Sequence, residues 1–305
     1  MRRYSYNLMS FNKYKVRIMK SYRCRFIILA FCGICLAQQV YPQSSSSDSS
    51  FHPYHVNYWV TGTIIGVGLS ANYLGEAWVF QKPELSRLEI QALNKGTINS
   101  IDSWALKQDP SKRDAFAKYS DYTVAATVVL PVFLMFDKRI NQDWFDVLLM
   151  YMETMSITPN IYEWSPLGVA FQNRIRPLAY SDQLTYEQRK SGDNRNSFYS
   201  GHTAVVAASA FFMAKVYCDY NPGIGNNKYL FYGAAMIPPL LEGYFRVKGL
   251  RHFPSDVIVG LGVGALCGIL IPEFHRFQDK NISLGLYSSS VATGIAIKWQ
   301  PNFLK

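Results

Sequence analysis

Cysteine and histidine are scarce in this chain, and their spacing suggests neither a disulfide framework nor a metal site. Three of the five cysteines fall within the first 37 residues, which leaves Cys218 and Cys267 for the rest. A bridge between these two is an open alternative that their spacing alone does not support. The five histidines form no cluster with the spacing of metal ligands. We therefore expect no metal and no cofactor.

Charge is also sparse, and most of the positive excess lies in one short segment. Charged residues make up 17% of the chain, hydrophobic residues make up 49%, and the formal net charge is +10. Eight of the 31 basic residues precede Asp48, the first acidic residue, so the remainder holds 23 basic and 21 acidic residues. A nucleic-acid binder needs its basic residues on the folded domain, so we expect no nucleic-acid partner.

The N-terminal segment has the pattern of an export signal. Basic residues precede an apolar run over 26–37, and polar residues follow it. We expect residues 1–37 to form a signal peptide or, alternatively, an uncleaved membrane anchor, with Met19 as a second possible start. A serine-rich linker over residues 38–55 follows.

Six apolar segments then predict an all-α bundle of about six helices. They run over residues 56–73, 122–136, 144–162, 203–217, 229–245 and 257–274. Segments of this length approach the ~20 residues that cross a bilayer, but they also suit buried core helices. We predict a membrane-embedded bundle within a domain over residues 56–280, with a compact soluble domain as the alternative. In the tail at 281–305, alternating residues predict a short β-hairpin, and Pro238-Pro239 predicts a kink in the fifth helix.

The membrane side of the bundle is ambiguous from the sequence. We expect an inner-membrane protein whose site faces the periplasm. If a signal exports the chain and all six segments cross, however, the connection over residues 75–119 is cytoplasmic, as is the connection that follows the third segment. Either one segment, most simply 56–73, does not span, or the site faces inward.

Three stretches carry the chemistry, and each lies at the boundary of a predicted helix. In the first, Arg174 and Arg176 precede Pro177, and their guanidinium groups match phosphate oxygens. They are equally explained as anchors on the positive-inside side of a membrane.

The second stretch contains Ser200, Gly201 and His202 at the start of a predicted helix. Ser200 is a good N-cap, Gly201 permits close approach of a ligand, and the helix N-terminus favours an anion. His202 would stand beside that anion and exchange protons with it. An ordinary capped helix with an incidental histidine is the alternative.

The third stretch contains Arg246, Arg251, His252 and Asp256. Pro254 suits the first turn of the last helix, and Asp256 is four residues from His252, so we expect its carboxylate to hold one imidazole nitrogen. That contact would make the other nitrogen a better nucleophile. A structural His-Asp pair is the alternative, but three anion-binding stretches together point to phosphoryl chemistry.

These stretches resemble the type 2 phosphatidic acid phosphatase superfamily, which includes bacterial acid phosphatases and vanadium haloperoxidases. Its pattern is Lys-x6-Arg-Pro, then Pro-Ser-Gly-His, then Ser-Arg-x5-His-x3-Asp. The chain matches it at Arg176-Pro177, at Ser200-Gly201-His202 and at Arg246-x5-His252-x3-Asp256, within residues 145–274. It departs from the pattern at Val169, Tyr199 and Phe245, which replace a lysine, a proline and a serine.

The resemblance implies a metal-independent phosphatase with a helical-bundle fold. In this reading His252 attacks phosphorus, Asp256 orients His252, and His202 protonates the leaving oxygen. The phosphate ligands implied are Arg176, Arg246, Ser200 and Gly201. Arg174 is our candidate to replace the lysine lost at Val169.

Three functions follow as hypotheses. The first is hydrolysis of a lipid phosphate or pyrophosphate: undecaprenyl pyrophosphate, a lipid A phosphate or a glycerophospholipid phosphate. The second is a soluble periplasmic acid phosphatase, and the third is a non-catalytic anion- or lipid-binding membrane protein. The expected partners are the lipid substrate and the bilayer, and the sequence indicates no obligate protein partner.

Overall fold

The computed structural model describes residues 51–79 and 81–276, together with the backbone of residues 282–288 and 293–299. The predicted signal or anchor over residues 1–37 and most of the linker lie outside the described residues. The long helices are α2 (Tyr58–Val79), α4 (Arg113–Val129), α6 (Trp144–Trp164), α8 (Gly201–Tyr220), α10 (Ile237–Lys248) and α11 (Pro254–Arg276). The shorter α-helices are α3 (Arg87–Gln91), α5 (Lys138–Gln142), α7 (Tyr186–Arg189) and α9 (Lys228–Ala235). The 3₁₀ helices are η1 (Lys95–Thr97), η2 (Asp102–Lys107), η3 (Pro110–Lys112), η4 (Leu130–Phe136), η5 (Pro177–Tyr180), η6 (Gly192–Arg195) and η7 (Pro222–Asn227).

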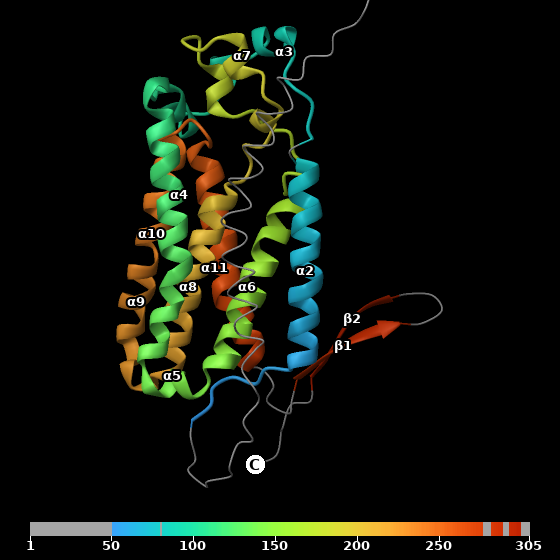
Figure 1. Cartoon of the computed structure of the whole chain (residues 1–305), viewed down its shortest axis with the longest axis vertical. Coiled ribbons are helices and arrows are strands. Elements are labelled where there is room, and N and C mark those ends of the chain that lie inside the picture. The colour runs from blue at the N-terminus through green and yellow to red at the C-terminus, as the bar shows by residue number, and fades with distance from the viewer. Residues whose placement is uncertain (1–50, 80, 277–281, 289–292, 300–305) are drawn as a thin grey trace, which may run out of the picture. The chain divides into compact units, whose positions relative to one another are not determined.

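The long helices run alongside one another, which confirms the predicted all-α bundle (Figure 1). The fifth predicted helix is divided at Met236 into α9 and α10, and Pro238 lies in the first turn of α10. Proline has no N–H to donate there, where the helix needs none, so the break falls just before the proline pair. α4 begins nine residues earlier than predicted, because its first turns are too polar to register as apolar.

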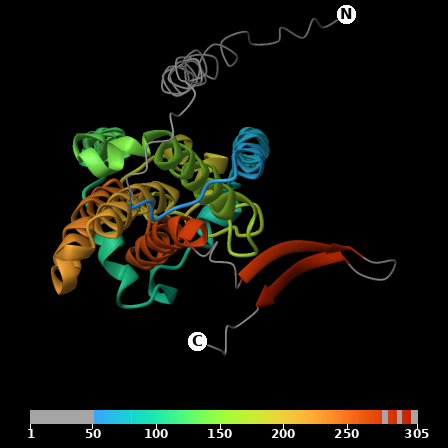
Figure 2. The same cartoon turned by 90° about the horizontal axis from the view of Figure 1, so that it is seen from below.

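Helix α8 lies at the centre of the bundle, in contact with α4, α6, α10 and α11 (Figure 2). It packs most closely on α11, whose glycines at 260, 264 and 268 face backbone atoms of Ser200, Ala204 and Ala208. A side chain at any of these three glycines would overlap that backbone. Four-residue spacing of small residues thus allows the two helices to approach.

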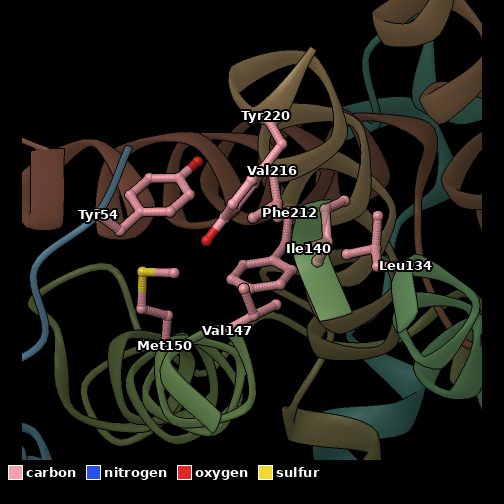
Figure 3. Close-up of a cluster of buried hydrophobic side chains, with 8 residues drawn as sticks. All are labelled: Tyr54, Leu134, Ile140, Val147, Met150, Phe212, Val216 and Tyr220. Atoms are coloured by element: carbon pink, nitrogen blue, oxygen red, sulfur yellow. The ribbon is translucent and has the colours of Figure 1, made fainter. Parts of the chain in front are cut away.

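A hydrophobic cluster fills the bundle around the second half of α8. Its members come from the segment before α2, from η4, α5, α6 and α8: Tyr54, Leu134, Ile140, Val147, Met150, Phe212, Val216 and Tyr220 (Figure 3). The His55 amide donates to the carbonyl of His275 near the end of α11. The chain therefore enters the bundle at the end where α8 and α11 finish.

The opposite end, where α8 and α11 begin, is capped by the connections α2–α4 and α6–α8. α3 and α7 lie beside each other there (Figure 1), and Leu85, Ile90 and Ala179 form a small buried cluster between these connections. At the C-terminal side of the chain, β1 (Ile282–Ser288) and β2 (Thr293–Trp299) pair antiparallel, with Ile282 opposite Trp299. This is the predicted hairpin.

Two helical stretches among the described residues are long and apolar enough to cross a membrane: 110–136 and 254–276. In both, most residues of the most apolar stretch are not buried within the protein.

Candidate active site

The three predicted stretches meet at the end of the bundle where α8 begins. The amide of Ser200 donates to the carbonyl of Asp256 (3.0 Å), and the amide of Ser197 donates to the carbonyl of Arg174 (3.0 Å). The amide of Arg176 in turn donates to the carbonyl of Asn194 (2.8 Å). Main-chain hydrogen bonds therefore join residues 18 to 56 positions apart and hold the three stretches in fixed positions.

His252 is buried, and both of its ring nitrogens have a defined neighbour. Nδ1 lies 2.5 Å from the carbonyl oxygen of Ser197, and Nε2 lies 3.1 Å from Nη2 of Arg246. A carbonyl oxygen only accepts, so Nδ1 carries the proton. Nε2 then presents its lone pair, which accepts from the guanidinium. This is the tautomer that a nucleophilic imidazole needs.

The surroundings favour the neutral form of this imidazole. Burial lowers the pKa of His252 well below its usual value, and the cations of Arg246 and Arg176 lower it further. The lone pair on Nε2 is therefore available at neutral pH.

Asp256 does not make the direct contact that we predicted. Its nearer carboxylate oxygen is 3.9 Å from Nδ1 of His252, beyond hydrogen-bond distance. The same oxygen accepts from Oγ of Ser197 (2.6 Å) and from the amide of Phe253 (2.8 Å). Asp256 thus holds Ser197, whose carbonyl contacts His252, and Phe253, which follows His252 in the chain. Any orientation of the imidazole by Asp256 acts through these two.

Arg174, predicted as a phosphate ligand, is paired with carboxylates instead. Its guanidinium donates to Asp256 and, at 2.6 Å, to the buried carboxylate of Asp102, and it lies over the ring of Phe253. Asp102 also accepts from the amide and hydroxyl of Ser255. Buried carboxylates need such partners, and they outcompete an occasional ligand for the guanidinium. The structure therefore gives Arg174 two carboxylate partners, and its contact with a phosphate stays a prediction.

Three other arginines, Arg176, Arg246 and Arg251, form a positively charged cluster. Nη1 of Arg176 and Nη1 of Arg251 both donate to one oxygen of Asp193, at 2.5 and 3.2 Å. Burial alone would raise the pKa of Asp193, but Arg176 and Arg251 outweigh it and bring this pKa to about 2. One carboxylate is thus shared by two cations, and the cluster retains a net positive charge.

Arg246 is buried at the end of α10, and its contacts are with neutral groups. Its Nη1 donates to Oγ of Ser120 (3.4 Å), which donates to the carboxylate of Glu242 (2.5 Å). Its buried Nε has no hydrogen-bond partner within the described residues. A buried, unpartnered guanidinium donor beside Nε2 of His252 fits a site for an anion.

His202 lies in the first turn of α8, with 43% of its side chain exposed. Its charged neighbours include Arg246, Arg176, Arg251 and Asp193, and Nε2 is 4.0 Å from the carboxylate of Asp121. The imidazole therefore faces the arginine cluster and remains open to solvent. This position lets it exchange protons with water and with a group bound at the cluster.

Ser200 and Gly201 begin α8 as predicted. The hydroxyl of Ser200 accepts from the amide of Thr203 and contacts its hydroxyl at 2.8 Å, so it caps the helix. A side chain at Gly201 would lie 3.0 Å from the ring of Tyr162. The small residue here thus makes room for a neighbouring ring, and the helix N-terminus still directs its partial positive charge toward the cluster.

Sequence reasoning missed several groups of this site. The carbonyl of Ser197 sets the tautomer of His252, Asp193 joins two arginines, and Asp102 fixes Arg174. None carries a motif of its own, since each acts through a contact between distant segments. Within the described residues, no group of three or more His, Cys, Asp or Glu residues is placed to hold a metal ion.

Comparison with known proteins identifies a protein family for part of the chain. Residues 148–280 match the sequence model of the PAP2 superfamily. These residues form a PAP2 superfamily domain. The match confirms the predicted superfamily and the predicted enzyme class, a phosphatase. It spans α8, α10, α11 and most of α6, and therefore includes His202, His252 and the three clustered arginines.

Among solved structures, this chain is similar to the crystal structure of a transmembrane PAP2-type phosphatidylglycerolphosphate phosphatase from Bacillus subtilis. The similarity covers 72% of this chain and 98% of the other, at 18% identity and a TM-score of 0.41. No curated protein matches the chain significantly.

Proposed function

We propose that this protein is a metal-independent phosphatase that hydrolyses a lipid phosphate or pyrophosphate through a phosphohistidine on Nε2 of His252. The observation that carries the proposal is the buried His252, whose unprotonated Nε2 faces Arg246. A site that only binds anions has no use for a buried imidazole held in its nucleophilic tautomer.

The first chemical step forms the N–P bond. The lone pair of Nε2 attacks phosphorus, the bond from phosphorus to the leaving oxygen breaks, and its electron pair stays on that oxygen. His202 donates the proton that this oxygen needs. Arg176, Arg246 and Arg251 neutralise the equatorial oxygens, on which charge accumulates in the transition state.

The second step hydrolyses the intermediate. His202, now neutral, takes a proton from water, and the water oxygen attacks phosphorus. The N–P bond breaks, its electrons return to Nε2, and orthophosphate leaves. Nδ1 keeps its proton and donates it to the carbonyl oxygen of Ser197 throughout, so the imidazole is restored in its starting tautomer.

The apolar faces of the bundle support a lipid substrate. Exposed large side chains follow α4, η4 and α11: Tyr122, Val129, Val132, Phe133, Phe136, Ile258, Leu266, Leu270 and Phe274. Water disfavours exposed apolar surface of this extent, whereas a bilayer accepts it. We therefore place the protein in a membrane of the bacterial envelope, with its site at the end of the bundle. Undecaprenyl pyrophosphate, lipid A phosphates and glycerophospholipid phosphates are the candidate substrates.

The test is phosphate release in detergent with EDTA present, from a panel of these lipids and a soluble monoester. We expect release by the wild type, and a fall of at least about 10³-fold in His252→Ala. His52→Ala, at the other end of the bundle, serves as the matched control and should keep its activity. A phosphoryl label on the protein that is stable to alkali, labile to acid and absent from His252→Ala would identify the intermediate.

Other outcomes point to the other functions. Wild-type protein that stays monodisperse without detergent and prefers the soluble monoester supports an acid phosphatase. Folded wild type that binds orthophosphate but releases none from any substrate supports a binding protein and overturns the proposal.

The site and residue 51 lie at opposite ends of the bundle, so the two are on opposite sides of a membrane crossed by all six helices. A periplasmic site, which we propose, requires that α2 does not cross or that residue 51 is cytoplasmic. Labelling of a cysteine placed at the exposed Leu88 by an impermeant reagent in intact cells tests this. Labelling only after lysis would place the site in the cytoplasm.

A further inference from the structure

Lys82 places a positive charge beside the position where the family pattern has its lysine. Its Nζ donates to the carbonyl oxygens of Val169 and Gln172, both at 2.6 Å. Lys82 follows α2 and therefore lies outside residues 148–280. The side chain of Val169 is fully buried and apolar, so any cation at this point has to come from another segment.

The segment that carries Lys82 is fixed to the loop that positions Arg176. Nδ2 of Asn196 donates to the carbonyl of Val79 (3.3 Å), and Nη2 of Arg176 donates to the carbonyl of Asn196 (3.2 Å). The carbonyl of Lys82 lies so close to Gly192 that a side chain there would overlap it. The backbone on both sides thus holds Lys82 beside the arginine cluster.

The charge of this lysine is unbalanced. No acidic side chain pairs with Lys82 in the part of the chain that the structure describes, and the charged groups that act on it are Arg195 and Arg176, both cations. Burial, followed by these two cations, lowers the pKa of Lys82 to about 8. Two carbonyls occupy two of its three N–H donors, which leaves one donor and the net charge for an anion.

We propose that Lys82 binds a phosphate oxygen of the substrate, with its third N–H directed to that oxygen, and so supplies the cation that Val169 does not. This inference rests on the proposed function for the identity of the anion. Arg174 is held by two carboxylates, whereas Lys82 has none, so Lys82 is the better of the two candidates for this role.

The test compares Lys82→Met, Lys82→Arg and the control Lys190→Met. Lys190 lies in the same capping region, but it is paired with Glu84 and Glu187. The readouts are KM for the lipid substrate, Ki for inorganic phosphate and the melting temperature. We expect Lys82→Met to raise KM and Ki at least about tenfold, with Lys82→Arg and Lys190→Met within about threefold of wild type.

The pH dependence separates binding from a purely structural role. Wild-type Ki should rise as the pH passes about 8, where Lys82 loses its proton, and Lys82→Arg should remove that rise because arginine stays charged. A folded Lys82→Met with wild-type Ki overturns the inference. If Lys82→Met does not fold, the pH profile of Lys82→Arg decides, and a profile identical to wild type overturns it.

Failure of the proposed function is distinguishable from failure of this inference. Direct binding of inorganic phosphate, measured by calorimetry, needs no turnover. Lys82-dependent phosphate binding by a wild type that releases no phosphate would sustain the inference and overturn the phosphatase. Turnover that is unaffected in Lys82→Met would sustain the phosphatase and overturn the inference.

Discussion

The carbonyl oxygen of Ser197 lies 2.5 Å from Nδ1 of His252 and decides which imidazole nitrogen carries the proton. The two residues are 55 positions apart. Asp256 supports this contact from behind by accepting a hydrogen bond from the hydroxyl of Ser197. A main-chain acceptor cannot be removed by a side-chain substitution, so the tautomer depends on the path of the loop before α8.

The buried neutral state of His252 should make stability depend on pH. The pKa of His252 is lowered on folding, so between that lowered value and about 6.5 the unfolded chain binds a proton that the folded chain does not. Stability therefore falls as the pH drops below about 6.5, by up to about 1.4 kcal/mol per unit. Between pH 7.5 and 5 we expect the melting temperature to fall more steeply with decreasing pH for the wild type than for His252→Asn. Equal slopes would contradict a buried neutral His252.

Arg174 and Asp256 should behave as an energetically coupled pair. Asp256→Asn leaves Arg174 with Asp102 alone, and breaking such a pair costs about 3 kcal/mol or more. In a double-mutant cycle with Arg174→Met we expect a coupling energy of about 0.5 to 3 kcal/mol. Denaturant unfolding measures it.

The same variants test whether Arg174 positions Asp256 or binds phosphate. Arg174→Met should lower stability and turnover while the Ki for inorganic phosphate changes less than about threefold. A large rise in Ki at wild-type stability would restore Arg174 as a phosphate ligand.

Asp193 should stabilise the fold at neutral pH and lose this effect in acid. Its pKa is about 2 in the folded protein, against about 3.9 in an unfolded chain, which corresponds to roughly 2 to 3 kcal/mol. Because the pKa is depressed, the contribution is complete above about pH 4 and is lost as the pH falls toward 2. Asp193→Asn should therefore be less stable than wild type at pH 7, and the two should converge in acid. A constant difference over this range would show that Asp193 acts by packing.

The glycines of α11 offer a matched pair of substitutions. A Cβ at Gly264 would lie 2.0 Å from the carbonyl oxygen of Ala204, whereas a Cβ at Gly262 has no atom within 4 Å. Backbone in a packed helix cannot move aside cheaply, so Gly264→Ala should cost about 1 to 3 kcal/mol. Gly262→Ala should be neutral or stabilising by up to about 1 kcal/mol. Thermal shift in detergent checks both, and equal melting temperatures would refute the close α8–α11 contact.

Much of the bundle was predictable because its helices are apolar over most of their length. The predicted segments 203–217 and 257–274 lie within α8 and α11. Ser200 caps α8 and Pro254 begins α11, as expected. Hydropathy failed at the start of α4, where Arg113, Asp114 and Lys118 form the first turns. The first turns of α4 form backbone hydrogen bonds whether or not their side chains are apolar. A helix boundary among polar residues therefore cannot be read from hydropathy.

The sequence by itself determined which residues have the chemistry of this site: His202, His252, Arg176 and Arg246 stand at fixed spacings near helix boundaries, where short-range rules hold. Only the tertiary structure decided their partners. In the folded chain, Nδ1 of His252 contacts the carbonyl of Ser197, and Arg174 pairs with two carboxylates. Nζ of Lys82 donates to the carbonyl of Val169. Such contacts join residues 55 to 87 positions apart. Their distances depend on how helices and loops pack, because local spacing does not encode the relative placement of distant segments.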